Sequence, residues 1–126
     1  MLVDNPMTVT IPVSDLERAR AWYEDMLGLM PVHVVPGEAL VFRTGAGDQL
    51  LLFASDEAGT AKHQVAAWRV DDLEAEVTEL RERGVRFENY DGPDLQTVDG
   101  IAATPVGRAA WFKDSEGNVL TISQLN

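Results

Sequence analysis

The apolar positions of the chain predict two copies of a strand followed by an amphipathic helix. Residues 8–13 alternate between two faces, with Val9, Ile11 and Val13 on one of them. The helix expected next has an apolar stripe made of Leu16, Ala19, Tyr23 and Met26. Residues 65–70 repeat the alternation, and a second stripe follows, made of Leu73, Val77 and Leu80. The repeat predicts that two related units are built one after the other.

Both helices carry signals at their ends. Ser14 and Glu17 have the spacing of a capping box, in which an N-cap side chain and a glutamate three residues later satisfy each other's backbone amides. Residues 71–74 repeat this pattern. Gly28 and Gly84 follow the apolar stripes, where a helix end favours a residue that tolerates a positive φ.

A second repeat predicts two β-hairpins. The stretch ALVFRTGAGDQLLLF (39–53) aligns with AAWFKDSEGNVLTIS (109–123), and each has a turn-forming centre between apolar runs. The first repeat has a spacing of 57 residues, as between Val13 and Val70, and the second has a spacing of 70, as between Phe42 and Phe112. The second copy therefore carries extra residues, which we place in the Gly- and Pro-rich segment 89–108.

Each half reads as one strand, a helix and three strands, which predicts an α+β fold of two paired βαβββ modules. We expect a single domain over residues 1–126, with module one at 7–54, module two at 64–124 and a linker at 55–63. One such unit cannot cover its own sheet, so two must pair, within the chain or between chains.

Composition and charge narrow the classes of partner. The net charge of −11 argues against nucleic acid and anionic membranes as partners, and it suits a cationic small molecule. The absence of cysteine excludes disulfides and thiolate chemistry. The sequence also contains no run of about 18 apolar residues, the length needed to span a bilayer. We expect a cytoplasmic protein.

These patterns resemble the vicinal oxygen chelate superfamily, which includes glyoxalase I, extradiol dioxygenases and bleomycin-resistance proteins. The resemblance rests on IPVSDLERARAWYEDMLGL (11–29), WRVDDLEAEVTELRERGVRFE (68–88) and AWFKDSEGNVLTI (110–122). It implies that the paired modules form a curved mixed sheet around a cavity. Members that depend on a metal bind it there through His, Gln or Glu on the first and last strands of each module.

In this chain, the positions that correspond to the metal ligands do not carry metal-binding side chains. The resemblance places them at Thr8, Leu51, Val65 and Thr121. A neutral threonine is a poor ligand, and leucine and valine have no donor atom. We therefore expect no metal and no other cofactor.

The leading hypothesis is a metal-free binding protein of the bleomycin-resistance type, present as a homodimer. It would hold a small organic molecule in the cavity between the modules. The expected pocket residues are Thr8, Thr10, Leu51, Phe53, Val65, Ala67, Trp111 and Thr121.

Two alternatives remain open from the sequence. A glyoxalase-like lyase or isomerase, or a dioxygenase relative, would bind a metal through His63, Gln64, Glu88 and Gln124. A module that assembles with another protein would have a vestigial cavity.

A strand is expected directly after the second helix, so Glu88, Tyr90 and Asp91 could reach the cavity mouth as acid or base. The segment 89–108 would then form a lid, a hairpin extension or a dimer contact.

Overall fold

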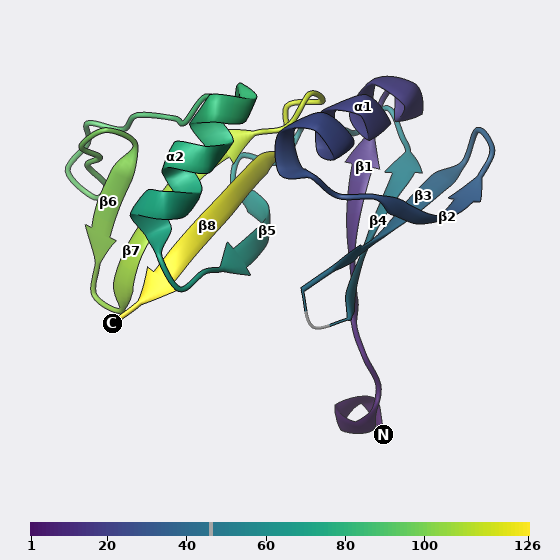
Figure 1. Cartoon of the computed structure of the whole chain (residues 1–126), viewed down its shortest axis with the longest axis horizontal. Helices are drawn as coiled ribbons and strands as arrows, with labels where there is room; N and C mark the ends of the chain where they lie inside the picture. The colour runs from purple at the N-terminus through teal and green to yellow at the C-terminus, as the bar shows by residue number, and fades with distance from the viewer. Residues whose placement is uncertain (46) are drawn as a thin grey trace.

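The computed structural model describes residues 1–45 and 47–126 and contains two four-stranded sheets, each with one helix (Figure 1). The elements of the first module are β1 (Thr8–Val13), α1 (Leu16–Leu27), β2 (Pro31–Val35), β3 (Ala39–Thr44) and β4 (Asp48–Ala54). The elements of the second are β5 (Gln64–Arg69), α2 (Leu73–Arg83), β6 (Ile101–Thr104), β7 (Gly107–Lys113) and β8 (Val119–Leu125). A short 3-10 helix, Leu2–Asp4, precedes β1 on a segment that extends away from the sheets (Figure 1).

The two sheets have the same topology. Their strand orders are β1-β4-β3-β2 and β5-β8-β7-β6. The pairs β1–β4 and β5–β8 are parallel, and the remaining neighbours are antiparallel. This confirms the predicted α+β fold of paired βαβββ modules. None of the helices in the described part of the chain is long and apolar enough to cross a membrane.

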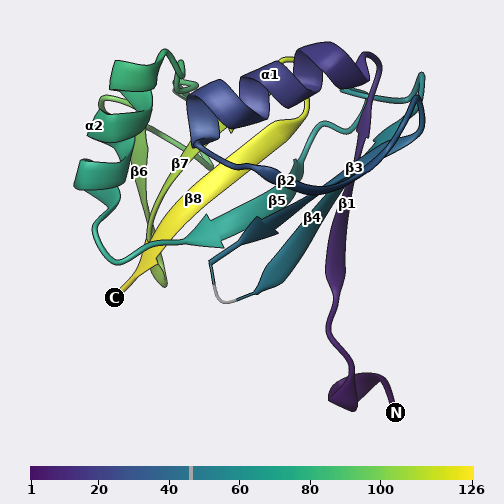
Figure 2. The ribbon, with the colours of Figure 1, turned by 45° about the vertical axis from the view of Figure 1, so that its right-hand side comes forward.

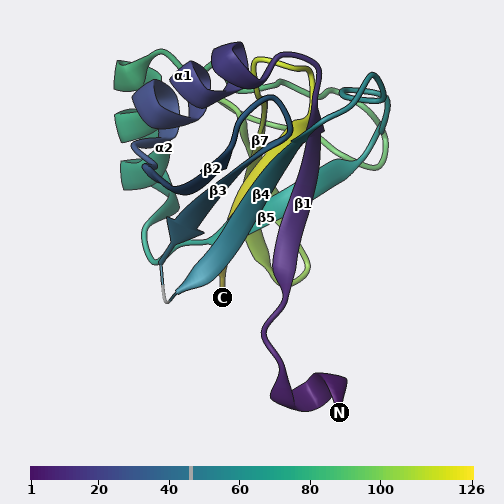
Figure 3. The same ribbon diagram turned by 90° about the vertical axis from the view of Figure 1, so that its right-hand side faces the viewer.

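The two modules share one hydrophobic core. Both helices lie on the same side of the strands and contact each other (Figure 2, Figure 3). Strands β1 and β5 are also in contact, so the two sheets meet at these strands. The core contains Tyr23 and Phe42 from the first module and Leu73 and Phe112 from the second, and all four are inaccessible to solvent. Burial of these large side chains in one cluster stabilises the modules as a pair.

Both helices begin one residue later than the capping boxes predict. The N-cap residues are Asp15 and Asp72, whose carboxylates accept hydrogen bonds from the amides of Arg18 and Ala75. The predicted capping boxes at Ser14 and Asp71 are therefore wrong. At the other ends, Gly28 has φ 69° and Gly84 has φ 109°, the left-handed conformation expected for helix-terminating glycine.

The segment between α2 and β6 is longer than its counterpart in the first module. The strand expected directly after α2 is not formed: residues 85–88 make one isolated bridge, between Phe87 and Phe112. Residues 101–104 of the segment 89–108 belong to β6 and residues 107–108 begin β7, so the extra residues lie before position 101. A bridge between Asp91 and Gln96 closes a small hairpin within them.

The β3–β4 hairpin forms as the sequence predicts, with Ala39 opposite Phe53 and Thr44 opposite Asp48. Its predicted Gly-rich turn includes Ala46, which lies outside the described residues.

The turn between β7 and β8 of the second module is hydrogen-bonded to the first module. The Glu116 side chain, fully buried, accepts hydrogen bonds from the Arg18 guanidinium at 2.9 Å, from the Ser14 hydroxyl at 2.8 Å and from the Asp15 amide at 2.9 Å. The Asn118 side-chain amide donates to the Pro12 carbonyl at 2.8 Å. Because each contact crosses the boundary between modules, the turn fixes their relative position.

Candidate ligand-binding face

The expected pocket residues belong to strands whose other face is covered by the helices. Leu50 and Leu52 of β4 are in the core, so Leu51, which lies between them, points to the opposite side. Leu120 and Ile122 of β8 are likewise in the core, so Thr121 points away from the helices. We call the side of the two sheets that faces away from α1 and α2 the open face.

Two rows of residues cross the open face at equivalent positions. In the first sheet, Leu51 is paired with Thr10 on β1 and with Val41 on β3. In the second sheet, Thr121 is paired with Ala67 on β5 and with Trp111 on β7. Each residue of the second row lies one sequence repeat after its counterpart in the first. Ala67 follows Thr10 by 57 residues, and Trp111 and Thr121 follow Val41 and Leu51 by 70. The structure thus brings five of the eight expected pocket residues into two matching rows, and Val41 is a member that sequence reasoning missed.

The other three expected residues lie at the margins of these rows. Phe53 is half-buried and pairs with Pro12 of β1. Thr8 is exposed at the start of β1, opposite Gln49. Val65 lies at a register shift in β5 and packs against the core cluster.

Thr121 carries a buried hydroxyl without a partner. The residue is only 4% exposed, and Oγ1 makes no hydrogen bond with any described residue. A buried hydroxyl without a hydrogen bond costs about 1–3 kcal/mol. Most buried polar groups in proteins are paired, so an unpaired one requires an explanation.

Trp111 stands beside Thr121 with a second aromatic ring against it. The Tyr90 ring meets the Trp111 indole edge to face, with 5.8 Å between ring centroids. Burial, and to a smaller extent the charge of Glu88, raises the pKa of Tyr90 above its usual value. The neighbouring Phe112 points into the core instead. The partnership of Tyr90 with Trp111 escaped sequence reasoning because the intervening segment has no periodic pattern.

The residues present do not fit a divalent metal at the family positions. The side chains of Thr8, Leu51, Val65 and Thr121 offer two neutral hydroxyls and no imidazole or carboxylate. Among residues 1–45 and 47–126, no group of three or more His, Asp or Glu side chains is placed to hold a metal ion.

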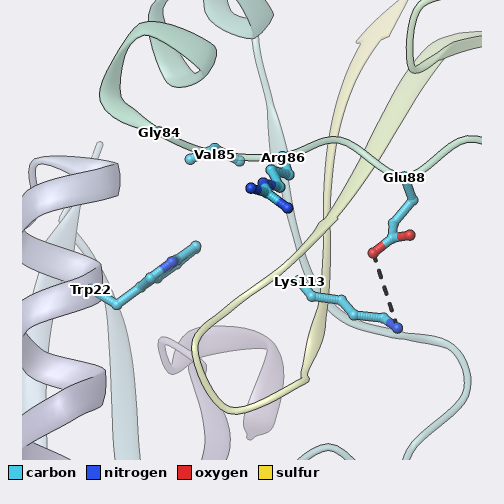
Figure 4. A pocket seen from close by; sticks show the side chains of 6 residues that line it. All are labelled: Trp22, Gly84, Val85, Arg86, Glu88 and Lys113. Carbon is cyan, nitrogen blue, oxygen red and sulfur yellow. Dashed lines mark ion pairs between the residues drawn. The ribbon is translucent and has the colours of Figure 1, made fainter.

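The side chains that the metal-dependent alternative would use as ligands have different surroundings in the structure. His63 is exposed, with Nδ1 2.8 Å from the Gln64 carbonyl oxygen. Glu88 lies 4.0 Å from the Lys113 ammonium in a surface pocket that also contains Trp22 (Figure 4). The Gln124 side-chain carbonyl caps α2 by accepting a 2.8 Å hydrogen bond from the Leu73 amide.

The expected pocket residues differ in how far they are exposed on the open face. Four pockets of about 250–600 Å³ in the described part of the chain are lined by other residues. Thr8, Thr10 and Ala67 are exposed, Leu51, Phe53 and Trp111 are partly covered, and Thr121 is buried. A ligand on this face would need further walls to be enclosed.

Comparison with solved structures finds similar chains along the full length. The antibiotic binding protein TnmS3 from Streptomyces sp. CB03234 is 28% identical, with a TM-score of 0.75, and the match covers 100% of this chain and 99% of that one. A glyoxalase/bleomycin resistance protein from the same organism is also 28% identical, with a TM-score of 0.67 and coverage of 95% and 100%. Lactoylglutathione lyase from Agrobacterium tumefaciens, at 21% identity, a TM-score of 0.70 and coverage of 95% and 92%, shares the fold.

A comparison with curated proteins finds no significant match. The model of the Glyoxalase/Bleomycin resistance protein/Dioxygenase superfamily matches residues 7–122. With this match over nearly the whole sequence, and with two βαβββ modules paired through one core, the chain belongs to the glyoxalase/bleomycin resistance protein/dioxygenase superfamily.

Proposed function

We propose that the chain is a metal-free binding protein for a small organic molecule and that the ligand lies on the open face. The 28% identity to an antibiotic binding protein over the whole chain supports a binding role and makes an antibiotic a reasonable ligand class. The neutral side chains at the family's metal positions support binding without a metal. The cytoplasmic location expected from the sequence stays a prediction.

The observation that carries the proposal is the unpaired hydroxyl of Thr121. A valine of nearly the same shape would avoid the cost of burying this group. A hydroxyl that is costly in the free protein is explained if the groups that cover it move aside and a ligand supplies its partner, because functional sites often carry locally unfavourable groups. Trp111 stands next to it and offers an aromatic surface for a flat part of the ligand.

A second copy of the chain would supply the missing walls. The open face carries exposed Thr8 and Thr10 beside the partly covered apolar side chains of Leu51 and Phe53. Such a mixed surface is suited to an interface that encloses a ligand, since binding pockets are mostly apolar with a few placed polar groups. We therefore propose a homodimer in which the open faces close the ligand sites.

The test is a ligand screen on chelator-treated protein. A panel of organic antibiotics that includes bleomycin is added, and the midpoint of thermal unfolding is measured with each compound. A ligand that binds only the folded state raises this midpoint in a concentration-dependent way. The proposal requires at least one such compound, with a binding site that nuclear magnetic resonance maps to Trp111. If the midpoint rises only when a divalent metal is restored, the metal-free proposal is wrong.

A further inference from the structure

A second pocket lies between the modules on the helix side of the sheets. It has a volume of about 250 Å³, and its lining includes Leu27 at the end of α1 and Leu80 on α2. Phe112 and Ile122 also line it, and both are in the core. The residues beside them, Trp111 and Thr121, point to the open face. The inter-module pocket is therefore on the opposite side of the sheet from the proposed ligand site.

The lining of the inter-module pocket is mostly apolar. Leu80, Phe112 and Ile122 are buried, and Leu27, Leu29 and Val70 are partly buried around them. The volume equals that of about eight water molecules in the liquid. Few polar partners are present for such waters, so an apolar molecule would replace them favourably. A six-membered ring with a two-carbon chain is of suitable size.

One charged side chain lines the same pocket. Glu76 of α2 is partly buried, and within residues 1–45 and 47–126 its carboxylate makes no ion pair and no hydrogen bond. Two other glutamates of the same helix are paired, Glu74 with Arg108 and Glu79 with Arg83. An unpaired carboxylate beside apolar groups favours a cation, because partial removal from water strengthens the attraction.

An indole ring lines the pocket together with this carboxylate. Trp68 is partly buried and packs against the core, and tryptophan is the aromatic side chain that attracts cations best. The net charge of −11 also raises the concentration of cations near the protein. A carboxylate and an indole in one apolar pocket form a suitable setting for an ammonium group on an apolar body.

We propose that the inter-module pocket binds a small primary amine with an apolar body, whose ammonium group pairs with Glu76. The inference stands on residues other than those of the open face and does not depend on the proposed function. Binding here would add contacts to both modules, so the amine stabilises their pairing.

The experiment titrates the protein with 2-phenylethylamine and with the neutral, equally sized 2-phenylethanol. Binding is followed through the indole N–H signals of Trp22, Trp68 and Trp111, assigned with single Trp→Phe variants. The amine should shift the signal of Trp68, leave that of Trp111 in place and bind more tightly than the alcohol. In Glu76→Gln the affinity for the amine should fall about fivefold, while that for the alcohol stays the same.

The matched control is Glu82→Gln, which removes the same charge from an exposed position of α2. It should leave both affinities unchanged. The proposal is overturned if the Trp68 signal does not move, if amine and alcohol bind equally well, or if Glu82→Gln weakens the amine as much as Glu76→Gln does. The last result would mean that only the overall charge attracts the amine.

Discussion

The Tyr23 hydroxyl donates a 2.6 Å hydrogen bond to Oδ2 of Asp114, which joins helix α1 of the first module to the β7–β8 turn of the second. Both side chains are buried, and burial raises the pKa of Tyr23 far above its usual value, with the Asp114 charge adding to the shift. The phenol therefore stays protonated and remains a donor at any ordinary pH. The contact acts together with the hydrogen bonds of Glu116 to hold the modules in one arrangement.

Removal of this single hydroxyl should destabilise the whole chain. In Tyr23→Phe the ring still fills its place in the core, but the buried Asp114 carboxylate loses a donor. We expect the free energy of unfolding to fall by about 1–3 kcal/mol. Chemical denaturation measures this change. Tyr90→Phe is the control, because the Tyr90 hydroxyl has no hydrogen-bond partner in the described residues, and equal losses in the two variants would contradict the role of the inter-module contact.

Glu116 makes the stability depend on pH in the acid range. Hydrogen bonds from Arg18, with smaller contributions from Ser115, Ser14 and the Asp15 amide, lower the pKa of Glu116 from 4.5 to about 2. Because the folded-state pKa is the lower one, the stabilisation is present above pH 4.5 and is lost as the pH falls toward 2. We expect Glu116→Gln to cost about 1–3 kcal/mol at neutral pH.

The same variant should also lose less stability than the wild type between pH 4.5 and pH 2. Denaturation midpoints at a series of pH values test this difference. A small part of the acid dependence should survive in the variant, because Arg108 lowers the pKa of Glu74 to about 2 as well, and solvent screens this exposed pair. Parallel curves for the two proteins would show that Glu116 is not the group responsible.

A charge on the open face should separate the proposed dimer. Thr10→Arg places a cation at the β1 end of the first row without touching the core, so each chain should stay folded while two copies repel. Sedimentation would show a dimer for the wild type and a monomer for this variant. Thr78→Arg, at an exposed position of α2, should remain dimeric. A monomeric wild type would contradict the proposed assembly.

Titration with divalent metals should produce no heat of specific binding. Chelator-stripped protein would be titrated with Zn²⁺, Ni²⁺, Mn²⁺ and Fe²⁺ in a calorimeter. The four family positions provide no ligand set for these ions, since they carry Thr8, Leu51, Val65 and Thr121. His63, the histidine nearest to β5, is exposed, and one histidine does not make a metal site. Tight binding at one metal per chain or per dimer, lost in His63→Ala, would favour the metal-dependent alternative.

Much of the fold follows from periodic patterns in the sequence. The pairing of the strands confirms both repeats. Thr10 of β1 pairs with Leu51 of β4, and the equivalent residues of the second module, Ala67 and Thr121, pair in the same way. These patterns are readable because the side chains of a strand alternate and those of a helix recur at fixed intervals. The family's scaffold could therefore be recognised from the sequence.

The sequence could not predict contacts between residues far apart in the chain. Ser14 has the spacing of an N-cap residue, yet Asp15 caps α1 while the Ser14 hydroxyl donates to Glu116. Nothing in the local sequence around Glu116 indicates that its carboxylate accepts bonds from residues about one hundred positions away. The strand expected directly after α2 does not form, because residues 85–88 make only one isolated bridge.

We propose that the hydroxyl of Thr121 serves a ligand at the expense of stability. This role is tested most directly by Thr121→Val, which keeps the shape of the side chain and removes the unpaired group. The free protein should gain about 1 kcal/mol of unfolding free energy. Affinity for a compound found in the antibiotic screen should fall about tenfold, in chelator-treated protein, while Thr78→Val changes neither quantity. A variant that is less stable than the wild type and binds the compound equally well would contradict this role of Thr121.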